Sequence, residues 1–160
     1  MSDDVVVAYT DGSAIKQVVD KTKYHGGAGV ILIYKGKEKR ISHPIEDGTN
    51  NISEITASIL ALEALNKPCD VRLVTDSQYV INGATKWCDG WVRRGWKTAA
   101  GQPVKNAELF KRLLNLCQIH NVTWEWVKGH NGDVNNEIAD ELACQASASL
   151  KEREIERISQ

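Results

Sequence analysis

The segment VRLVTDS, residues 71–77, joins a short apolar strand to the start of a helix. Most of its first five residues are β-branched or apolar, which favours a buried strand. Asp76 and Ser77 are residue types that commonly begin helices, and a mixed helical pattern continues from them toward Trp87. A strand that leads directly into a helix is the repeating unit of α/β proteins, so this segment predicts a sheet with a parallel portion.

The residues before this segment predict that the sheet begins with antiparallel strands. Val5–Tyr9 and Val30–Tyr34 are short runs rich in β-branched residues, and Lys35-Gly36-Lys37 suits a hairpin turn. The turn leads into a more polar stretch at 38–42, which is typical of a strand with one face toward water. Three antiparallel strands are therefore expected before the parallel ones.

Apolar residues at helical spacing predict a helix from about Asn51 to the residue before Pro68. The same spacing indicates a helix around 109–116, alternation predicts a strand over 122–127, and a closing helix is expected over 139–150. No repeat or linker interrupts the chain. We expect one domain over residues 1–160, with a core at about 5–150 and an extension at 151–160.

Composition restricts the class of protein. A chain of 160 residues with 42% hydrophobic and 26% charged residues suits one globular domain, and its longest apolar runs have five residues where a membrane helix needs about twenty. The acidic start lacks a secretory signal, so a cytoplasmic location is expected. Four cysteines without a CxxC pair are interpreted as reduced thiols.

The charge is unevenly distributed along the chain. The formal net charge is −1, yet the segment from Lys86 to Arg112 holds seven basic and two acidic residues. Three tryptophans, Trp87, Trp91 and Trp96, stand among these bases. A charge run of this kind is often a solvated face, whereas cations interleaved with aromatic rings also suit contacts with a nucleic-acid backbone.

Four acidic residues occupy similar places: Asp11, Glu54, Asp76 and Asp140 each stand at the end of a predicted strand or within a predicted helix. Each has an ordinary interpretation. Asp11 precedes a glycine as in a turn, Asp76 suits a helix cap, Glu54 follows Asn51 at capping-box spacing, and Asp140 can be solvated. If the four converge, their repulsion requires a counterion, and carboxylate oxygens favour Mg²⁺ or Mn²⁺ over zinc. Phosphoryl transfer assisted by two metal ions is the matching chemistry.

With these residues the sequence resembles type 1 ribonuclease H, the bacterial kind, over about residues 5–150. Five blocks carry the resemblance in order: YTDGS at 9–13, TNN at 49–51 with Glu54 after it, VTDSQY at 74–79, WEWVKGH at 124–130, and NE at 136–137 followed by DELA at 140–143. The resemblance implies the α/β ribonuclease H-like fold, a five-stranded mixed sheet flanked by helices with its first three strands antiparallel. It also implies a metal-dependent endonuclease that hydrolyses the RNA strand of RNA–DNA hybrids, leaving 5′-phosphate and 3′-hydroxyl ends.

The resemblance assigns roles to individual residues. It implies that Asp11, Glu54, Asp76 and Asp140 bind two Mg²⁺ ions in the presence of substrate, with Mn²⁺ as a possible substitute, and that His130 is the family's mobile catalytic histidine. Its implied contacts to the hybrid are Thr49, Asn50, Asn51 and Gln78 near the acids, and Trp87, Trp91, Arg93, Arg94 and Lys97 in a basic protrusion. Alternative structural roles are helix caps for the first group and core packing for the tryptophans. We expect both kinds of role, with Trp96 and part of Trp87 buried.

One segment departs from the family pattern. Many relatives have a short turn rich in Gly, Pro and Asn after the first aspartate, whereas residues 14–25 here are longer, basic and free of glycine. Lys16, Lys21 and Lys23 either contact phosphates or belong to a simple surface extension, and we favour the extension because surface loops vary freely.

Two other functions fit parts of the pattern. A nuclease of the same superfold that acts on DNA shares clustered acids, and a non-catalytic module that binds hybrids needs only the contact residues. Intact acids at all four positions favour the enzyme. We expect a monomer that binds an RNA–DNA hybrid, without a membrane association or an obligate protein partner.

Overall fold

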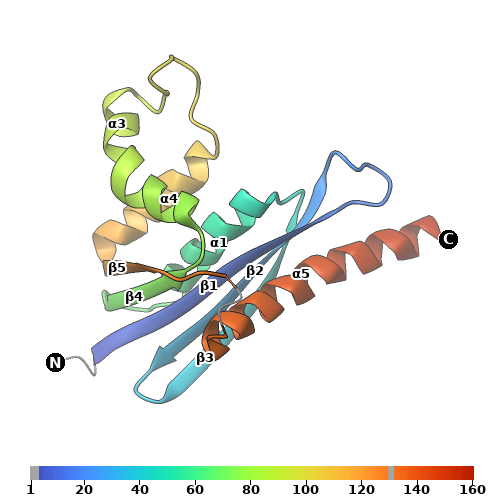
Figure 1. Ribbon diagram of the computed structural model, residues 1–160, viewed down its shortest axis with the longest axis horizontal. Helices are drawn as coiled ribbons and strands as arrows, with labels where there is room; N and C mark the ends of the chain where they lie inside the picture. Colours follow the sequence, from blue (N-terminus) through green and yellow to red (C-terminus); the bar gives the residue numbers. More distant parts are fainter. Residues whose placement is uncertain (1–3, 130–131) are drawn as a thin grey trace.

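The computed structural model describes residues 4–129 and 132–160, which contain one five-stranded mixed sheet (Figure 1). The strands are β1 (Val5–Lys16), β2 (Tyr24–Tyr34), β3 (Lys37–Glu46), β4 (Asp70–Thr75) and β5 (Asn121–Trp126), and their order in the sheet is β3-β2-β1-β4-β5. The first three pair antiparallel, while β4 lies parallel to both β1 and β5. This confirms the predicted α/β fold class and its antiparallel start.

Helices cover both faces of the sheet. The helical elements are α1 (Asn50–Glu63), α2 (Gln78–Asn82), the π-helical turn η2 (Gly83–Trp87), α3 (Cys88–Arg93), α4 (Ala107–Ile119) and α5 (Val134–Ile158). The long helix α5 packs on β1, β2 and β3, and α1 packs on β1, β2 and α4 (Figure 1). In β2, Gly26 approaches Ser53 of α1 and Gly27 approaches Ala143 of α5, so the two helices lie on opposite faces.

Adjacent residues of the central strands therefore belong to two different cores. Ala8, Val30 and Leu73 are buried toward α1 and α4, whereas their neighbours in sequence, Tyr9, Ile31 and Val74, are buried toward α5. This alternation explains why the central strands appear as continuous apolar runs in the sequence. The two cores fix α1 and α5 against the same central strands, β1 and β2.

The first two strands are longer than the sequence indicates. The predicted strands 5–9 and 30–34 extend to Lys16 and back to Tyr24, so Asp11 lies inside β1 and not at its close or in a turn. The predicted loop 14–25 shrinks to residues 17–23. In the sequence, glycines near the ends of these two runs suggest that the strands stop there. In the structure the strands continue through these glycines, and Gly12 and Gly26 allow α1 to approach closely at Ser53.

Two helical regions also differ from prediction. The stretch after Asp76 is divided into α2, η2 and α3, and Gly83 at the start of η2 packs against the ring of Phe110 so closely that a side chain would clash. The closing helix α5 continues from the predicted 150 to Ile158, so most of the expected extension is helical.

Two expectations from composition can be compared with the coordinates. All four cysteines are free thiols, as predicted. Across the part of the chain that the structure describes, none of the helices combines the length and apolar character needed to cross a bilayer.

Candidate active site

Three acidic side chains that are far apart in sequence converge beside the sheet. Asp11 lies in β1, Glu54 in α1, and Asp76 directly follows β4. One carboxylate oxygen from each lies within 4.8 Å of the corresponding oxygens of the other two. Asp11 and Glu54 are buried, with 5% and 7% of their surface exposed, while Asp76 is half-buried. The predicted convergence is therefore present for these three acids.

A glycine lets the first two acids meet. A Cβ atom placed on Gly12 would lie 2.5 Å from the backbone nitrogen of Glu54, so any larger residue would push α1 away from β1. The Gly12 N–H also donates a hydrogen bond of 2.9 Å to Asp11 Oδ1 and orients that carboxylate. Gly12 thus sets both the distance between the two elements and the direction of one acid.

The fourth acid, Asp140, joins the cluster from α5. Asp11 is paired in the sheet with Gly29 of β2, and Gly29 lies directly under the backbone of α5 at Ala139 and Ala143. The close approach brings the neighbouring residue Asp140 near enough to Asp11 to contribute to the raised pKa of the Asp11 carboxyl. Asp140 is half-buried and stands outside the compact group of three.

Burial and mutual repulsion disfavour the charged forms of these acids. Desolvation, followed by the charge of Asp76 and the hydrogen bond with Asp140, raises the pKa of Asp11 to about 8. Desolvation, followed by the charges of Asp11 and Asp76, raises the pKa of Glu54 well above its usual value. A site that binds protons in place of a cation has the electrostatics of a metal site without its metal.

The donor set fits a hard divalent cation. Glu54 Oε1 and Asp76 Oδ1 have no hydrogen-bond partner among the residues that the structure describes. None of the ion pairs found within residues 4–129 and 132–160 involves any of the four acids. Buried carboxylate oxygens without a partner are costly, and oxygen-only ligands favour Mg²⁺ or Mn²⁺.

The capping interpretations apply to neighbours of the acids and not to the acids. Thr49 is the N-cap of α1, where its hydroxyl accepts the N–H of Ile52 at 3.2 Å, so Glu54 does not stand at the capping-box position. Ser77 is the N-cap of α2 and accepts the N–H of Val80 at 3.2 Å, which leaves the Asp76 side chain free of that role. The structural roles are thus filled by Thr49 and Ser77.

The other predicted contacts near the acids lie at the starts of α1 and α2. Asn50 and Asn51 are exposed in the first turn of α1, and Gln78 is exposed at the first position of α2. Both helices begin beside the carboxylate cluster, because Glu54 belongs to one and Asp76 precedes the other. His130, the predicted catalytic histidine, lies outside the described residues.

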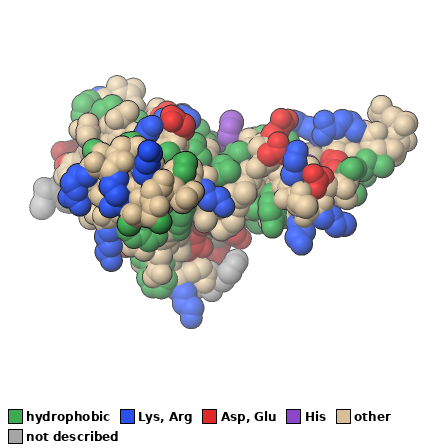
Figure 2. All heavy atoms as spheres, turned by 90° about the horizontal axis from the view of Figure 1, so that it is seen from above, with side chains coloured by type: hydrophobic (Ala, Val, Ile, Leu, Met, Phe, Trp, Pro, Cys, Tyr) green, Lys and Arg blue, Asp and Glu red, His purple; other side chains and the backbone are tan. Residues whose placement is uncertain are grey.

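The basic protrusion is built on a chain of aromatic rings. The ring of Trp91 packs in tilted contacts, with a distance between ring centroids of 5.1 Å to the buried Phe110 and 5.9 Å to both Trp87 and Trp96. Trp87 is 41% exposed and Trp96 is half-buried, so neither is fully enclosed in the core. The cations Arg93, Arg94 and Lys97 are exposed. In Figure 2 several Lys and Arg side chains gather on the left, over α3 and the loop after it.

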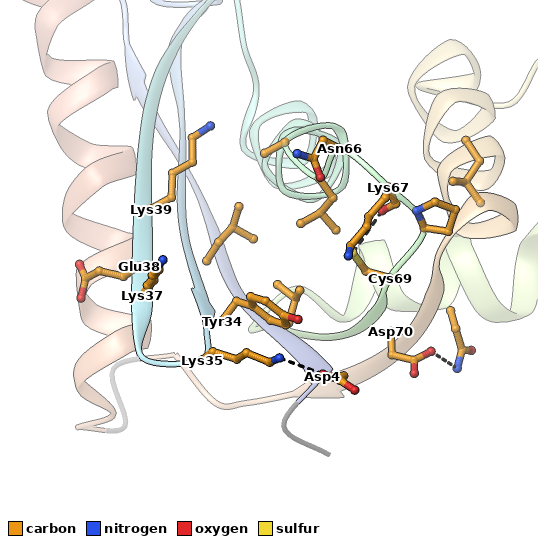
Figure 3. A pocket seen from close by; sticks show the side chains of 17 residues that line it. Asp4, Tyr34, Lys35, Lys37, Glu38, Lys39, Asn66, Lys67, Cys69 and Asp70 are labelled. Atoms are coloured by element: carbon orange, nitrogen blue, oxygen red, sulfur yellow. Dashed lines mark hydrogen bonds and ion pairs between the residues drawn. The ribbon is translucent and has the colours of Figure 1, made fainter. Parts of the chain in front are cut away.

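A pocket of about 820 Å³ lies away from the acids (Figure 3). It opens at the start of β1 and β4, whereas Asp11 lies in the middle of β1 and Asp76 follows the end of β4. Its rim includes Lys35, whose Nζ lies 3.3 Å from Asp4 Oδ1. None of the four acids lines it, so the site depends on the acid cluster and not on this cavity.

Sequence reasoning missed the residues that hold the acids in place. Gly12 and Gly29 set the approach of α1 and α5. Trp126 of β5 donates its Nε1–H to the backbone oxygen of Asp76 at 3.1 Å and ties β5 to the start of the site. The signal available in the sequence was a glycine inside an otherwise strand-like run, which often marks a close backbone approach.

Comparison with known proteins agrees with this geometry. The family described as RNase H matches residues 3–148. "Ribonuclease HI" of Xylella fastidiosa (strain Temecula1 / ATCC 700964) is 51% identical over 139 residues, covering 87% of this chain and 89% of the relative. "Ribonuclease H" of Zymomonas mobilis is 46% identical over 152 residues, covering 95% and 94%.

Solved structures show the same arrangement of elements. The crystal structure of LC9-RNase H1, described as a type 1 RNase H with the type 2 active-site motif, superposes with a TM-score of 0.79 at 31% identity, covering 91% of this chain and 73% of that one. The solution structure of the PFV RNase H domain gives 0.75 at 31% identity, with coverages of 90% and 94%.

Proposed function

The chain belongs to the ribonuclease H family, and on that premise we propose that it cleaves the RNA strand of RNA–DNA hybrids at the cluster of Asp11, Glu54 and Asp76. The observation that carries the proposal is the approach of three carboxylate oxygens to within 4.8 Å, with oxygens of Glu54 and Asp76 left unpartnered among the described residues. Asp140 completes the set, because it lies near enough to Asp11 to contribute to the raised pKa of that carboxyl. The ligand chemistry favours Mg²⁺, with Mn²⁺ as a substitute.

The four acidic side chains are held in place by the packed strands and helices that carry them. Asp11, Glu54, Asp76 and Asp140 would hold two Mg²⁺ ions in the presence of substrate, and these ions supply an activated water and charge stabilisation for the leaving oxygen. Gly12 keeps Asp11 oriented through its N–H, and the two cores hold β1, α1 and α5 in fixed positions. Before the ions bind, burial and the neighbouring carboxylates raise the pKa of Asp11 to about 8 and the pKa of Glu54 well above its usual value. Metal binding therefore competes with proton binding at these carboxylates.

Polar groups beside the acids are proposed to select the substrate. Asn50, Asn51 and Gln78 are exposed amides that can hydrogen-bond to the 2′-hydroxyls displayed in the minor groove of a hybrid. Thr49, besides capping α1, is proposed to contact a phosphate of the DNA strand. His130 is proposed to assist at the scissile phosphate or in product release, because a histidine can transfer a proton near neutral pH.

The basic protrusion is proposed to hold the DNA strand. Trp87 and Trp91 offer ring surface for sugars, while Arg93, Arg94 and Lys97 offer exposed positive charge for phosphates. This part of the site would account for affinity more than for cleavage. We further propose that the protein works as a cytoplasmic monomer.

Cleavage of a hybrid whose RNA strand carries an end label tests the function. We expect cleavage in Mg²⁺, products with 5′-phosphate and 3′-hydroxyl ends, and no cleavage with a chelator. Duplex DNA of the same sequence is the comparison substrate, and preferential cleavage of duplex DNA would favour a related DNA nuclease. A non-catalytic module would bind the hybrid equally with and without Mg²⁺ and leave the RNA intact.

A further inference from the structure

The hairpin between β1 and β2 and the end of α5 form an arm that projects from the body of the protein. The arm consists of residues 16–25 and 149–158, and in Figure 1 both segments extend beyond the rest of the molecule on the right. The family match ends at residue 148, so the helical half of the arm lies outside it. The hairpin half, residues 16–25, lies within the matched region.

A buried carboxylate holds the two halves of the arm together. Glu154 Oε1 accepts the N–H of Val18 at 2.8 Å and lies 2.6 Å from His25 Nε2, and Glu154 Oε2 accepts the N–H of Val19 at 3.0 Å. Glu154 and His25 are 8% and 6% exposed. The two backbone hydrogen bonds, followed by the bond to His25, lower the pKa of Glu154 to about 2. The loop is thus fixed to α5 by a buried carboxylate that contacts Val18, Val19 and His25.

The outer surface of the arm is positively charged. It carries six exposed cations, Lys16, Lys21, Lys23, Lys151, Arg153 and Arg157, against three acids that are not buried, Asp20, Glu152 and Glu156. No ion pair within the described residues engages any of the six. Asp20 accepts hydrogen bonds from Thr22 and also interacts electrostatically with Lys23. In Figure 2 Lys and Arg side chains line both edges of the arm, which is at the right.

The arm continues the same strand and the same helix that carry Asp11 and Asp140. Asp11 and Lys16 are five residues apart in the same strand, which is about 17 Å at the rise of an extended chain. Asp140 and Glu154 are fourteen residues apart in α5, which is about 21 Å of helix. Phosphates of one strand recur about every 3.4 Å along a duplex axis, so the arm reaches about five or six nucleotides beyond the cleaved phosphate.

We propose that this arm is a second phosphate-binding element, through which Lys16, Lys21 and Lys23 contact the hybrid about five or six nucleotides from the scissile bond. The proposal rests on the proposed function and adds a contact on the side of the site opposite the basic protrusion. We call the contacts of Glu154 with Val18, Val19 and His25 the latch. The latch holds the loop that carries these lysines in one position before the hybrid binds, which lowers the entropic cost of binding.

The test measures hybrid affinity by fluorescence anisotropy in a chelator, where no cleavage occurs. The substrate has a short central run of ribonucleotides in an otherwise DNA strand, with duplex of about twelve base pairs on each side. Two shortened forms each keep only about three base pairs on one side, which the arm cannot reach. The variant K16A/K21A/K23A is compared with K37A/K39A/K67A, a matched triple of exposed lysines near the pocket.

We expect K16A/K21A/K23A to raise the Kd of the long hybrid severalfold and to lower the slope of log Kd against log salt by about one for each phosphate that is no longer neutralised. The defect should disappear on one shortened form and persist on the other, because the arm lies on one side of the acids. An unchanged Kd, an equal defect on all three substrates, or an equal defect in K37A/K39A/K67A would overturn the proposal. A parent protein that leaves the RNA strand whole in Mg²⁺ would instead refute the proposed function.

The variant E154Q separates position from charge, because it leaves all three lysines in place. We expect faster hydrogen exchange at the Val18 and Val19 amides and a higher Kd for the long hybrid only. Exchange that becomes faster while the affinity for the long hybrid stays unchanged would show that the latch does not serve binding.

Discussion

Asp140 of α5 lies close enough to Asp11 of β1 to help raise the pKa of the Asp11 carboxyl to about 8, so Asp11 holds a proton at neutral pH in the metal-free protein. The proton takes the place of a countercharge in the site. Its presence links the stability of the protein to both pH and magnesium.

Without metal, the protein should lose stability as the pH rises from about 4 to about 8. The pKa of Asp11 is about 8 in the folded chain and near 3.8 when unfolded, so the folded state binds more protons over this range. We expect a loss on the order of 2 kcal/mol between pH 5 and pH 8 in a chelator, measured by urea unfolding. Mg²⁺ should restore stability at pH 8, and Asp11→Asn should flatten the pH dependence. A flat profile for the parent would contradict the proposed electrostatics.

Asp11→Asn should stop cleavage while leaving hybrid binding largely intact. The amide keeps the shape of the side chain but removes an anionic ligand, so kcat should fall by about 1,000-fold or more. Single-turnover cleavage in Mg²⁺ and anisotropy in a chelator measure the two properties separately. Cleavage close to the parent rate would place the active site elsewhere.

Gly12→Ala should damage the site through the backbone. The added methyl group would lie 2.5 Å from the Glu54 nitrogen, so α1 must move and stability should fall by about 1–3 kcal/mol. The rate of cleavage should fall as well, because Glu54 moves with its helix. The control Gly90→Ala meets only the flexible Arg94 side chain, and its free energy of unfolding should equal or exceed that of the parent. Parent-like stability and activity of Gly12→Ala would show that α1 is free to shift.

The variant R93A/R94A/K97A should weaken hybrid binding more than it slows cleavage at saturation. The slope of log Kd against log salt should fall by about one for every phosphate that these cations neutralise in the parent. Anisotropy at several salt concentrations gives this slope. A slope equal to that of the parent would mean that the three cations are a solvated face.

The sequence was sufficient for the fold class and for the identity of the three clustered acids. Short apolar runs predicted the first, second and fourth strands, a polar stretch after a hairpin turn predicted the third, and alternation predicted the fifth. The strand–helix junction at Asp76 predicted the parallel portion. The resemblance pointed to Asp11, Glu54 and Asp76 before any geometry was known, and their oxygens do converge. The strands and the motifs could be recognised because each depends on residues that are close together in the sequence.

What the sequence could not provide depends on contacts between distant segments. The continuation of β1 to Lys16 is stabilised by pairing with β2, and the glycines that suggested an end to these strands are explained only by helices that pack on them. Glu154 is one of three acids among three bases in residues 151–160, and nothing nearby in sequence indicates that its partners are Val18 and Val19. Such pairings follow from tertiary packing and not from local propensity.

Gly29 lies across the sheet from Asp11 and beneath the turn of α5 that carries Asp140. In alanine scanning a methyl group serves as the harmless reference, but at this position the methyl group is itself the obstruction. Alanine scanning of the acidic side chains would therefore miss Gly29 of β2, whose close contact with α5 positions Asp140. Gly29, which has no side chain, thus reports on the approach of α5 to β2, a part of active-site assembly that substituting the acids does not reveal.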